Sequence, residues 1–264
     1  MIFNVGLLVS LCLWIENIVA DNSTSIPEKG HLFQCDCGKV NEMNARIIGG
    51  SEVNPPHKYP WMVTIGNSRV DFQCGGALIT LQYVLTSVRC VEYDEVVIVG
   101  IGVRNLSESY EQILSQTIKK HPLYEKDPIK HDIALIMLQR PVNLYLDVST
   151  ICLPHNYDLE KPGIDAVVAG WGYYSNEYDR SPVLKETVMK IFPGTEQIVA
   201  KGENSSETSD GDTGSPLFVE YKEELRQHVI GVLSKEERGM TYFARVSSSL
   251  TWILQNIQDG AMCQ

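Results

Sequence analysis

The sequence is poor in basic residues, in long apolar runs and in helical periodicity, and each shortage excludes a class of protein. Lysine and arginine number 22 against 33 aspartates and glutamates, so the formal net charge is −11 at pH 7. Because nucleic acids and anionic membranes attract basic surfaces, we expect neither as the main partner. The N-terminal apolar run, residues 5–15, is well short of the roughly 20 residues that span a bilayer. A membrane anchor is therefore disfavoured.

Complete metal-binding and nucleotide-binding motifs are also missing. Cys35 and Cys37 have a spacing seen in metal sites, but no second cysteine or histidine pair completes four-fold zinc coordination. No acidic loop has calcium spacing, and the Gly-Ile-Gly of residues 100–102 does not precede a helix. We therefore predict no metal and no cofactor, and we assign the cysteines to disulfides.

Residues 1–20 have the pattern of a secretory signal peptide. An apolar stretch leads to Ala20, a small residue of the kind found just before a cleavage site. Removal of this segment takes away Cys12 and leaves six of the seven cysteines. An even number of cysteines in an exported chain indicates disulfides, so we expect a secreted, extracellular protein.

The rest of the chain predicts an all-β body with one C-terminal helix. From Tyr59 onward, short β-type segments are separated by Gly, Pro, Asn and Asp. The clearest segments are residues 61–65, 76–80, 96–99, 133–138, 166–169 and 229–233. Near the end, the serines of residues 247–249 can cap a helix. The apolar residues that then share one helical face are Leu250, Ile253, Leu254 and Ile257.

Eight short segments give the chain a resemblance to the chymotrypsin-like serine proteases, in the family's order and near its spacing. They are RIIGG at 46–50, CGGALI at 74–79, VLTSVRCV at 84–91, HDIALIML at 131–138, ICLP at 151–154, AGWG at 169–172, GDTGSPL at 211–217 and RVSSSLTWI at 245–253. The resemblance implies two packed six-stranded antiparallel β-barrels with any site in the cleft between them. It divides the chain into the signal peptide at 1–20, a short disulfide-tethered pro-segment at 21–46 and a protease-like domain at 47–264.

The catalytic positions of the family are occupied by residues unsuited to its chemistry. GDTGSPL resembles the GDSGGPL turn that holds the nucleophilic serine, which puts Thr213 at that position and Gly211 and Thr213 at the oxyanion hole. The LTSVRC segment resembles LTAAHC and puts Arg89 at the position of the histidine base, while Asp132 matches the orienting aspartate. A guanidinium stays protonated and has no acceptor atom, so it cannot take a proton. We expect Arg89 to pair with Asp132, and His131, its neighbour on an extended segment, to point away.

The RIIGG segment at 46–50 resembles the activation site of the family's zymogens. Cleavage after Arg46 would free the α-amino group of Ile47, which in the family inserts into the body and pairs with the aspartate before the nucleophile, here Asp212. A buried ammonium needs a buried carboxylate, because each alone would be costly.

The specificity pocket is expected to be altered. The family's SWG segment corresponds to Ser234, Lys235 and Glu236, so two charged side chains would stand at the pocket wall. Glu207 falls where trypsin has its pocket aspartate, and we interpret it as a solvated charge.

The resemblance also assigns the disulfides. Cys74 and Cys90 match a family bridge, and Cys152 in ICLP matches the cysteine that tethers the pro-segment. One of Cys35 and Cys37 should therefore reach Cys152 and the other Cys263, and the sequence leaves open which. Three N-x-S/T triplets are candidate glycosylation sites, at Asn22, Asn105 and Asn204.

The leading hypothesis is a catalytically inactive serine protease homologue that acts by binding proteins. The resemblance implies partners among extracellular proteases, zymogens or protease inhibitors, in an immune, melanisation, clotting or venom setting, and an activating protease at Arg46. The alternatives are a weak or atypical serine-type endopeptidase that uses Thr213, and an inert structural or secretory component.

Overall fold

The structure is a computed structural model that describes residues 36–41, 51–155, 157–172, 180–202 and 210–257. The chain divides into two units, residues 1–32 and 33–264, and every described residue belongs to the second. Among the described residues, no helix has the length and apolar character to cross a membrane. Several predicted features lie outside the described residues: the signal peptide, Arg46, Ile47, Cys35, Cys263, Glu207, Asn22 and Asn204.

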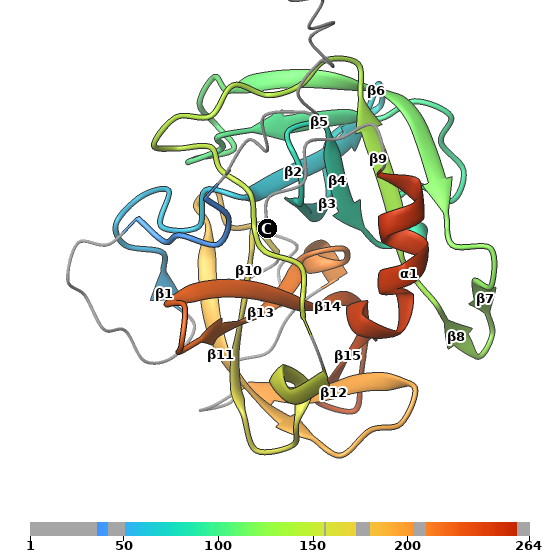
Figure 1. The fold of residues 1–264 in the computed structure, drawn as a ribbon. Coiled ribbons are helices and arrows are strands. Elements are labelled where there is room, and N and C mark those ends of the chain that lie inside the picture. Colours follow the sequence, from blue (N-terminus) through green and yellow to red (C-terminus); the bar gives the residue numbers. More distant parts are fainter. Residues whose placement is uncertain (1–35, 42–50, 156, 173–179, 203–209, 258–264) are drawn as a thin grey trace, which may run out of the picture. The chain divides into compact units, whose positions relative to one another are not determined.

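The first half of the domain is a closed barrel of six antiparallel strands, in the order β2-β3-β4-β9-β6-β5 (Figure 1). The strands are β2 Met62–Asn67, β3 Val70–Leu78, β4 Tyr83–Thr86, β5 Ile98–Ile101, β6 Glu111–Lys120 and β9 Ala134–Leu138. Alternate residues of each strand point inward, and the buried ones form one apolar cluster. Its members include Val63, Ile65, Leu78, Val84, Val99 and Ile136.

The second half closes in the same way. Its strands follow the order β11-β10-β13-β14-β15-β12, and β12 pairs back onto β11. They are β10 Asp165–Gly170, β11 Lys185–Phe192, β12 Gln197–Gly202, β13 Pro216–Tyr221, β14 Arg226–Glu237 and β15 Met240–Arg245. The short β1, Ser51–Glu52, adds to the edge of β11. The prediction of two six-stranded antiparallel barrels is confirmed.

Aromatic side chains pack the two barrels together. Trp61, which precedes β2, lies edge-on to Phe218 of β13, with ring centroids 5.4 Å apart. Tyr59 also meets Phe218, at 4.8 Å between centroids. All three side chains are buried, and such pairs contribute about 0.5–1.5 kcal/mol each beyond their burial. The barrels therefore form one body with the candidate site at their junction.

The C-terminal helix α1, Val246–Asn256, is present, but the prediction of its cap and of its face was partly wrong. Arg245 is the N-cap residue and makes no side-chain cap hydrogen bond. Because β15 runs directly into the helix, the predicted serine cap falls inside the first turn. The buried residues of the helix and its C-cap are Val246, Ser249, Ile253 and Ile257. Leu254, expected on this face, is 38% exposed.

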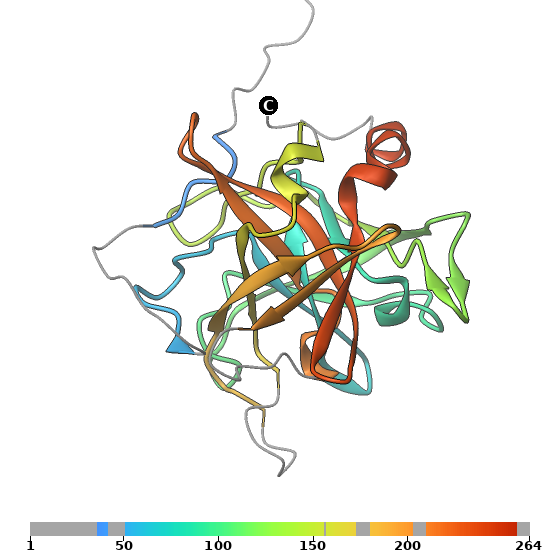
Figure 2. The ribbon, with the colours of Figure 1, turned by 90° about the horizontal axis from the view of Figure 1, so that it is seen from below.

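The smaller elements lie in the connections between strands. The hairpin of β7 Glu125–Lys126 and β8 Ile129–Lys130 extends away from the barrels in both ribbon views (Figure 2). Three short 3-10 helices complete the described part of the chain: Val88–Cys90, Tyr157–Glu160 and Asp210–Asp212.

Candidate functional site

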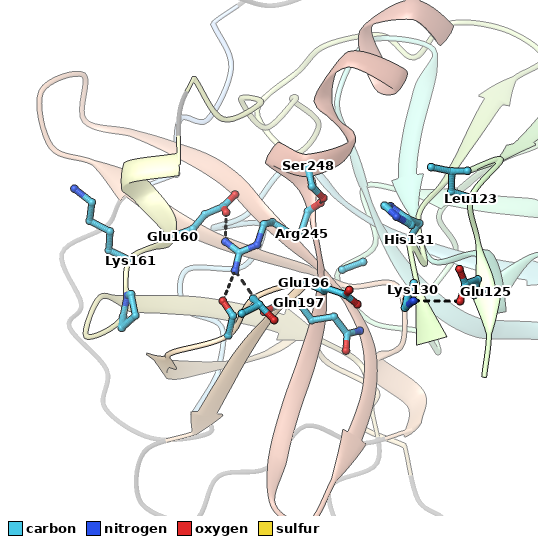
Figure 3. Close-up of a pocket in the computed structure, with 14 residues that line it drawn as sticks. Leu123, Glu125, Lys130, His131, Glu160, Lys161, Glu196, Gln197, Arg245 and Ser248 are labelled. Atoms are coloured by element: carbon cyan, nitrogen blue, oxygen red, sulfur yellow. Dashed lines mark hydrogen bonds and ion pairs between the residues drawn. The ribbon is translucent and has the colours of Figure 1, made fainter. Parts of the chain in front are cut away.

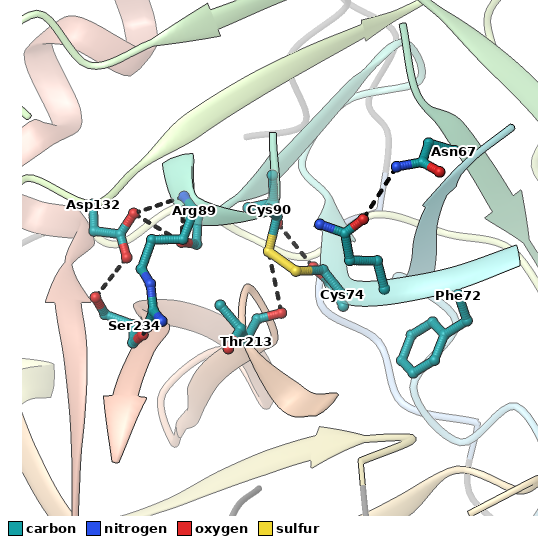
Figure 4. The surroundings of a disulfide bond; sticks show 12 residues. Asn67, Phe72, Cys74, Arg89, Cys90, Asp132, Thr213 and Ser234 are labelled. Carbon is teal, nitrogen blue, oxygen red and sulfur yellow. Dashed lines mark hydrogen bonds between the residues drawn. A yellow bond between two sulfur atoms is a disulfide. The ribbon is translucent and has the colours of Figure 1, made fainter. Parts of the chain in front are cut away.

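Asp132 is the buried centre of the site, and donors from both barrels satisfy it. Its side chain is 0% exposed. Oδ1 accepts hydrogen bonds from the Ser87 hydroxyl at 2.7 Å and from the Arg89 backbone N–H at 3.2 Å (Figure 4). Oδ2 accepts from the Ser234 hydroxyl at 2.5 Å. Burial raises the pKa of Asp132, and the hydrogen bonds from Ser234, Ser87 and the Arg89 N–H oppose that rise.

Arg89 does not form the predicted ion pair with Asp132. Its guanidinium Nη1 instead donates to the backbone carbonyl of Ser234, on β14 of the other barrel (Figure 4). Among the described residues, no ion pair joins this guanidinium to the carboxylate. The physical reason is that the two serine hydroxyls and the Arg89 backbone N–H already satisfy both carboxylate oxygens. The exposed Arg89 side chain keeps its charge near water. Arg89 thus crosses the junction between the barrels.

The turn that carries Thr213 is fixed by its backbone. The Thr213 carbonyl accepts the Gly75 N–H at 2.9 Å, and the Gly214 N–H donates to the Leu233 carbonyl at 2.8 Å. Gly214 has φ of 85°, and a Cβ there would lie 2.3 Å from the Thr86 hydroxyl oxygen. Only glycine fits such a position, so the turn keeps its shape whatever the side chain at 213.

Asp212 lies beside the end of β10. Its Oδ1 accepts the backbone N–H of Gly172 at 2.8 Å. A Cβ on Gly170 would lie 2.1 Å from that oxygen, so this glycine makes room for the carboxylate. The pairing of Asp212 with Ile47 stays a prediction, because Ile47 lies outside the described residues. Gly211, the other predicted oxyanion-hole residue, is buried beside it.

The three predicted pocket residues on β14 have different surroundings. Ser234 is fully buried against Asp132. Lys235 binds within its own hairpin, since its Nζ lies 2.8 Å from a Glu237 carboxylate oxygen and 4.9 Å from the centre of the Tyr242 ring. Glu236 pairs in register with Thr241 of β15.

Two disulfides lie within the described residues. Cys74 is bonded to Cys90, as predicted. Cys152 is bonded to Cys37, which resolves the choice that the sequence left open.

The half-buried Asn105 accepts the Ser107 N–H at 2.8 Å, and its glycosylation stays a prediction.

The described histidines contact aromatic rings, carboxylates and one another. His131 has φ of 47°, so its backbone is not the extended segment that we assumed. Its ring stacks on His121, with centroids 4.8 Å apart, and His121 packs against Trp252 of α1. His57 lies 3.9 Å from a carboxylate oxygen of Asp147. The remaining two, His155 and His228, lie together, with their ring centroids 4.6 Å apart.

Stability should fall in acid because of His121. Burial, with a smaller contribution from His131, lowers the pKa of His121 from 6.5 to about 4. Its Nδ1 accepts the Leu123 N–H at 3.2 Å, which requires an unprotonated nitrogen. The contribution of His121 to stability is therefore fully present above pH 6.5 and is lost as the pH falls toward 4.

The measurement is urea unfolding at several pH values between 4 and 7, on the native protein and on His121→Gln. Glutamine can still accept the Leu123 N–H, so the variant keeps that bond without a titrating ring. We expect a smaller acid-induced loss of unfolding free energy in the variant. Equal losses in the two proteins would contradict the assignment to His121.

Comparison with known proteins shows the family of the chain. The family model described as "Trypsin" matches residues 47–253. This chain belongs to the trypsin family. It is 30% identical to phenoloxidase-activating factor 3 of Holotrichia diomphalia, over 97% of this chain and 84% of that protein. It is 25% identical to the clotting factor G beta subunit of Tachypleus tridentatus, over 98% and 94% respectively.

A solved structure supports the same fold. The human heparin binding protein superimposes with a TM-score of 0.72 and 24% identity, over 81% of this chain and 97% of that chain. At this identity the likeness shows the trypsin-family architecture alone.

Sequence reasoning missed how Asp132 is satisfied. Within LTSVRC, Ser87 stands where the family pattern LTAAHC has its first alanine. That serine also accepts the Arg89 N–H at 3.0 Å while it donates to Asp132. The departure at position 87 was the available signal, because a hydroxyl beside a buried carboxylate is a ready donor.

Proposed function

We propose that this chain is a secreted, catalytically inactive member of the trypsin family that acts by binding proteins of an extracellular protease cascade. One observation carries the inactive assignment. The side chain at position 89 is a guanidinium that donates to the Ser234 carbonyl, and it offers no atom that could accept a proton.

The chemistry of the neighbouring residues supports this proposal. A serine-type peptidase needs a base to activate a weakly acidic hydroxyl and a carboxylate to orient that base. Asp132 is present, but its oxygens accept hydrogen bonds from Ser87, Ser234 and the Arg89 backbone. Thr213 brings a hydroxyl with an extra methyl group, and the family's base position holds the Arg89 guanidinium, which cannot accept a proton. We infer that the site keeps the family's backbone fold but cannot carry out its peptide hydrolysis.

The binding role is inferred from the relatives and from the activation segment. Two relatives carry names that refer to phenoloxidase activation and to clotting. Arg46, Ile47 and Asp212 have the residue types that a cleavage-driven switch needs. In such a switch, cleavage places a new charge against a carboxylate and reorganises the surrounding loops. A binding surface that forms only after cleavage would make the protein a regulated cofactor or decoy.

The experiment compares the native protein with Arg46→Gln in a phenoloxidase-activation assay and in a clotting assay, both in arthropod haemolymph. We expect the native protein to change the rate of one cascade only after cleavage at Arg46, and the variant to have no effect. The matched control is Arg104→Gln, which removes an exposed arginine elsewhere on the domain. Equal behaviour of native protein and Arg46→Gln would refute the switch and favour an inert component.

The alternative function is a weak peptidase that uses Thr213. It predicts turnover of a broad peptide library by the cleaved native protein, above the rate of a mock preparation. It also predicts that Thr213→Ala abolishes that turnover. Either result, obtained with clean cleavage at Arg46, would exclude the inactive assignment.

A further inference from the structure

Two histidines and a glutamate converge where β14 begins, beside the turn that precedes it. His155, Glu224 and His228 each offer one ligand atom, and these atoms lie within 4.8 Å of one another. The His155 Nε2 is 3.4 Å from Glu224 Oε1, and the His228 Nε2 is 3.6 Å from Glu224 Oε2. The two imidazole rings meet at 4.6 Å between centroids.

Three different elements deliver these side chains. His228 is an inward-facing residue of β14, and its backbone neighbours pair with Cys152. Glu224 lies in the tight turn between β13 and β14, where the Glu224 N–H donates to the Tyr221 carbonyl at 3.1 Å. His155 follows the ICLP segment by one residue. Backbone hydrogen bonds therefore hold the strand and the turn in place, and His155 stands beside them.

His228 is the decisive residue. Its side chain is 0% exposed, and its Nδ1 lies 3.0 Å from the Leu153 carbonyl. A carbonyl only accepts, so Nδ1 carries the proton and the neutral ring keeps its lone pair on Nε2. That Nε2 is buried, and it has no hydrogen-bond partner among the described residues.

An imidazole held in this way has the tautomer and the orientation of a metal ligand. Metal-binding histidines usually donate their second ring nitrogen to a carbonyl or carboxylate, which fixes the tautomer and the ring orientation. Leaving a buried acceptor unpaired costs about 1–3 kcal/mol, so an occupant for Nε2 would stabilise the fold.

We propose that His155, Glu224 and His228 form a site for a divalent transition-metal ion of the zinc class. Two imidazole nitrogens and one carboxylate favour zinc over calcium or magnesium, which prefer oxygen ligands. In a tetrahedral zinc site, ligand atoms lie roughly 3.4 Å apart. Here the two imidazole nitrogens approach the two oxygens of the Glu224 carboxylate at 3.4 Å and 3.6 Å, and one ligand atom from each of the three residues lies within 4.8 Å of the others. His155 and Glu224 are exposed, so an ion can enter from solvent and keep a water as its fourth ligand.

Such an ion would link the segment after Cys152, which the disulfide joins to Cys37, to the second barrel. Cys152, which is bonded to Cys37, lies two residues before Pro154 and three before His155. The metal would join this segment to the β13–β14 turn through Glu224. It would therefore stabilise the anchorage of the pro-segment whether or not the domain has any catalytic activity.

The test uses the full, tag-free protein after chelator treatment, titrated with Zn²⁺ by calorimetry and with Co²⁺ by absorption. We expect one Zn²⁺ per chain at this site and a zinc-dependent rise in melting temperature. His155→Ala and Glu224→Gln should each weaken Zn²⁺ affinity by at least about 100-fold, because loss of a second-shell partner alone costs up to that amount. Both residues are exposed, so the variants should fold.

The matched control is Glu223→Gln, which removes the neighbouring carboxylate that accepts the Tyr221 hydroxyl at 2.7 Å. It should leave the affinity unchanged. The proposal is overturned if the native chain shows no saturable binding, or if His155→Ala and Glu224→Gln bind as the native chain does. It is also overturned if bound Co²⁺ shows the strong near-ultraviolet band of thiolate ligands, because the ion would then be held by cysteines.

Discussion

Peptide hydrolysis should appear when Arg89→His, Thr213→Ser and Ser87→Ala are combined in the protein cleaved at Arg46. The first two changes supply a base and a nucleophile, and in a serine protease series the loss of either costs on the order of a million-fold in kcat. The third frees Asp132 Oδ1, which now accepts the Ser87 hydroxyl at 2.7 Å, to orient the new imidazole. We therefore expect the triple variant to be more active than the double variant that keeps Ser87.

Labelling by a serine-reactive phosphonate and turnover of a broad peptide library are the two readouts. The native protein should be silent in both, and the control Ser87→Ala with Arg89→His and Thr213→Ala should remain silent. Recovery in the triple variant should be partial, because Lys235 and Glu236 still follow Ser234 on β14. Turnover by the native protein at a rate near that of the triple variant would contradict the inactive assignment.

The fold was predictable because its determinants are local and ordered along the chain. Short alternating segments specify strands, and the eight family-like segments fix their order in two barrels. The cap of α1 was not predictable from composition, because serines at residues 247–249 suit a cap only where a loop precedes the helix. Here β15 ends at Arg245 and the helix begins at Val246, so no loop intervenes.

The site was predictable in position but not in its hydrogen bonds. The sequence placed Arg89 near Asp132, and the structure confirms that proximity through the Arg89 backbone N–H. Charge complementarity suggested an ion pair between the side chains, but a serine hydroxyl reaches a buried carboxylate at lower desolvation cost than a guanidinium does. Ser87 and Ser234 thus take the role that we assigned to Arg89.

The proposed metal site departs from the sequence-based expectation of no metal. That expectation rested on the spacing of the cysteines, whereas His155 stands far along the chain from Glu224 and His228. Only the pairing of Cys152 with β14 brings these residues together. Sites assembled from distant segments in this way leave no local motif.

A buried ion pair joins the 3-10 helix Tyr157–Glu160 to the start of α1. Arg245, the N-cap of the helix, donates through Nη1 to Glu160, and their side chains are 13% and 1% exposed. The two face each other at the edge of a pocket of about 720 Å³, which His131 and Lys130 line from the opposite side (Figure 3). Arg245 Nη2 also lies 3.3 Å from the Gly194 carbonyl. Loss of Glu160 would leave this guanidinium charge without its carboxylate.

Glu160→Gln should lower the free energy of unfolding by about 3 kcal/mol or more, because removal of one partner leaves a buried charge uncompensated. Urea unfolding at neutral pH measures the loss. The matched control is Asp165→Asn, which breaks the exposed pair of Asp165 with Lys190 at 2.6 Å and should cost no more than about 1 kcal/mol. Glu160→Leu combined with Arg245→Met should recover most of the loss, since apolar replacements remove both charges. Equal losses in Glu160→Gln and Asp165→Asn would show that solvent reaches the Arg245 pair and that burial does not set its strength.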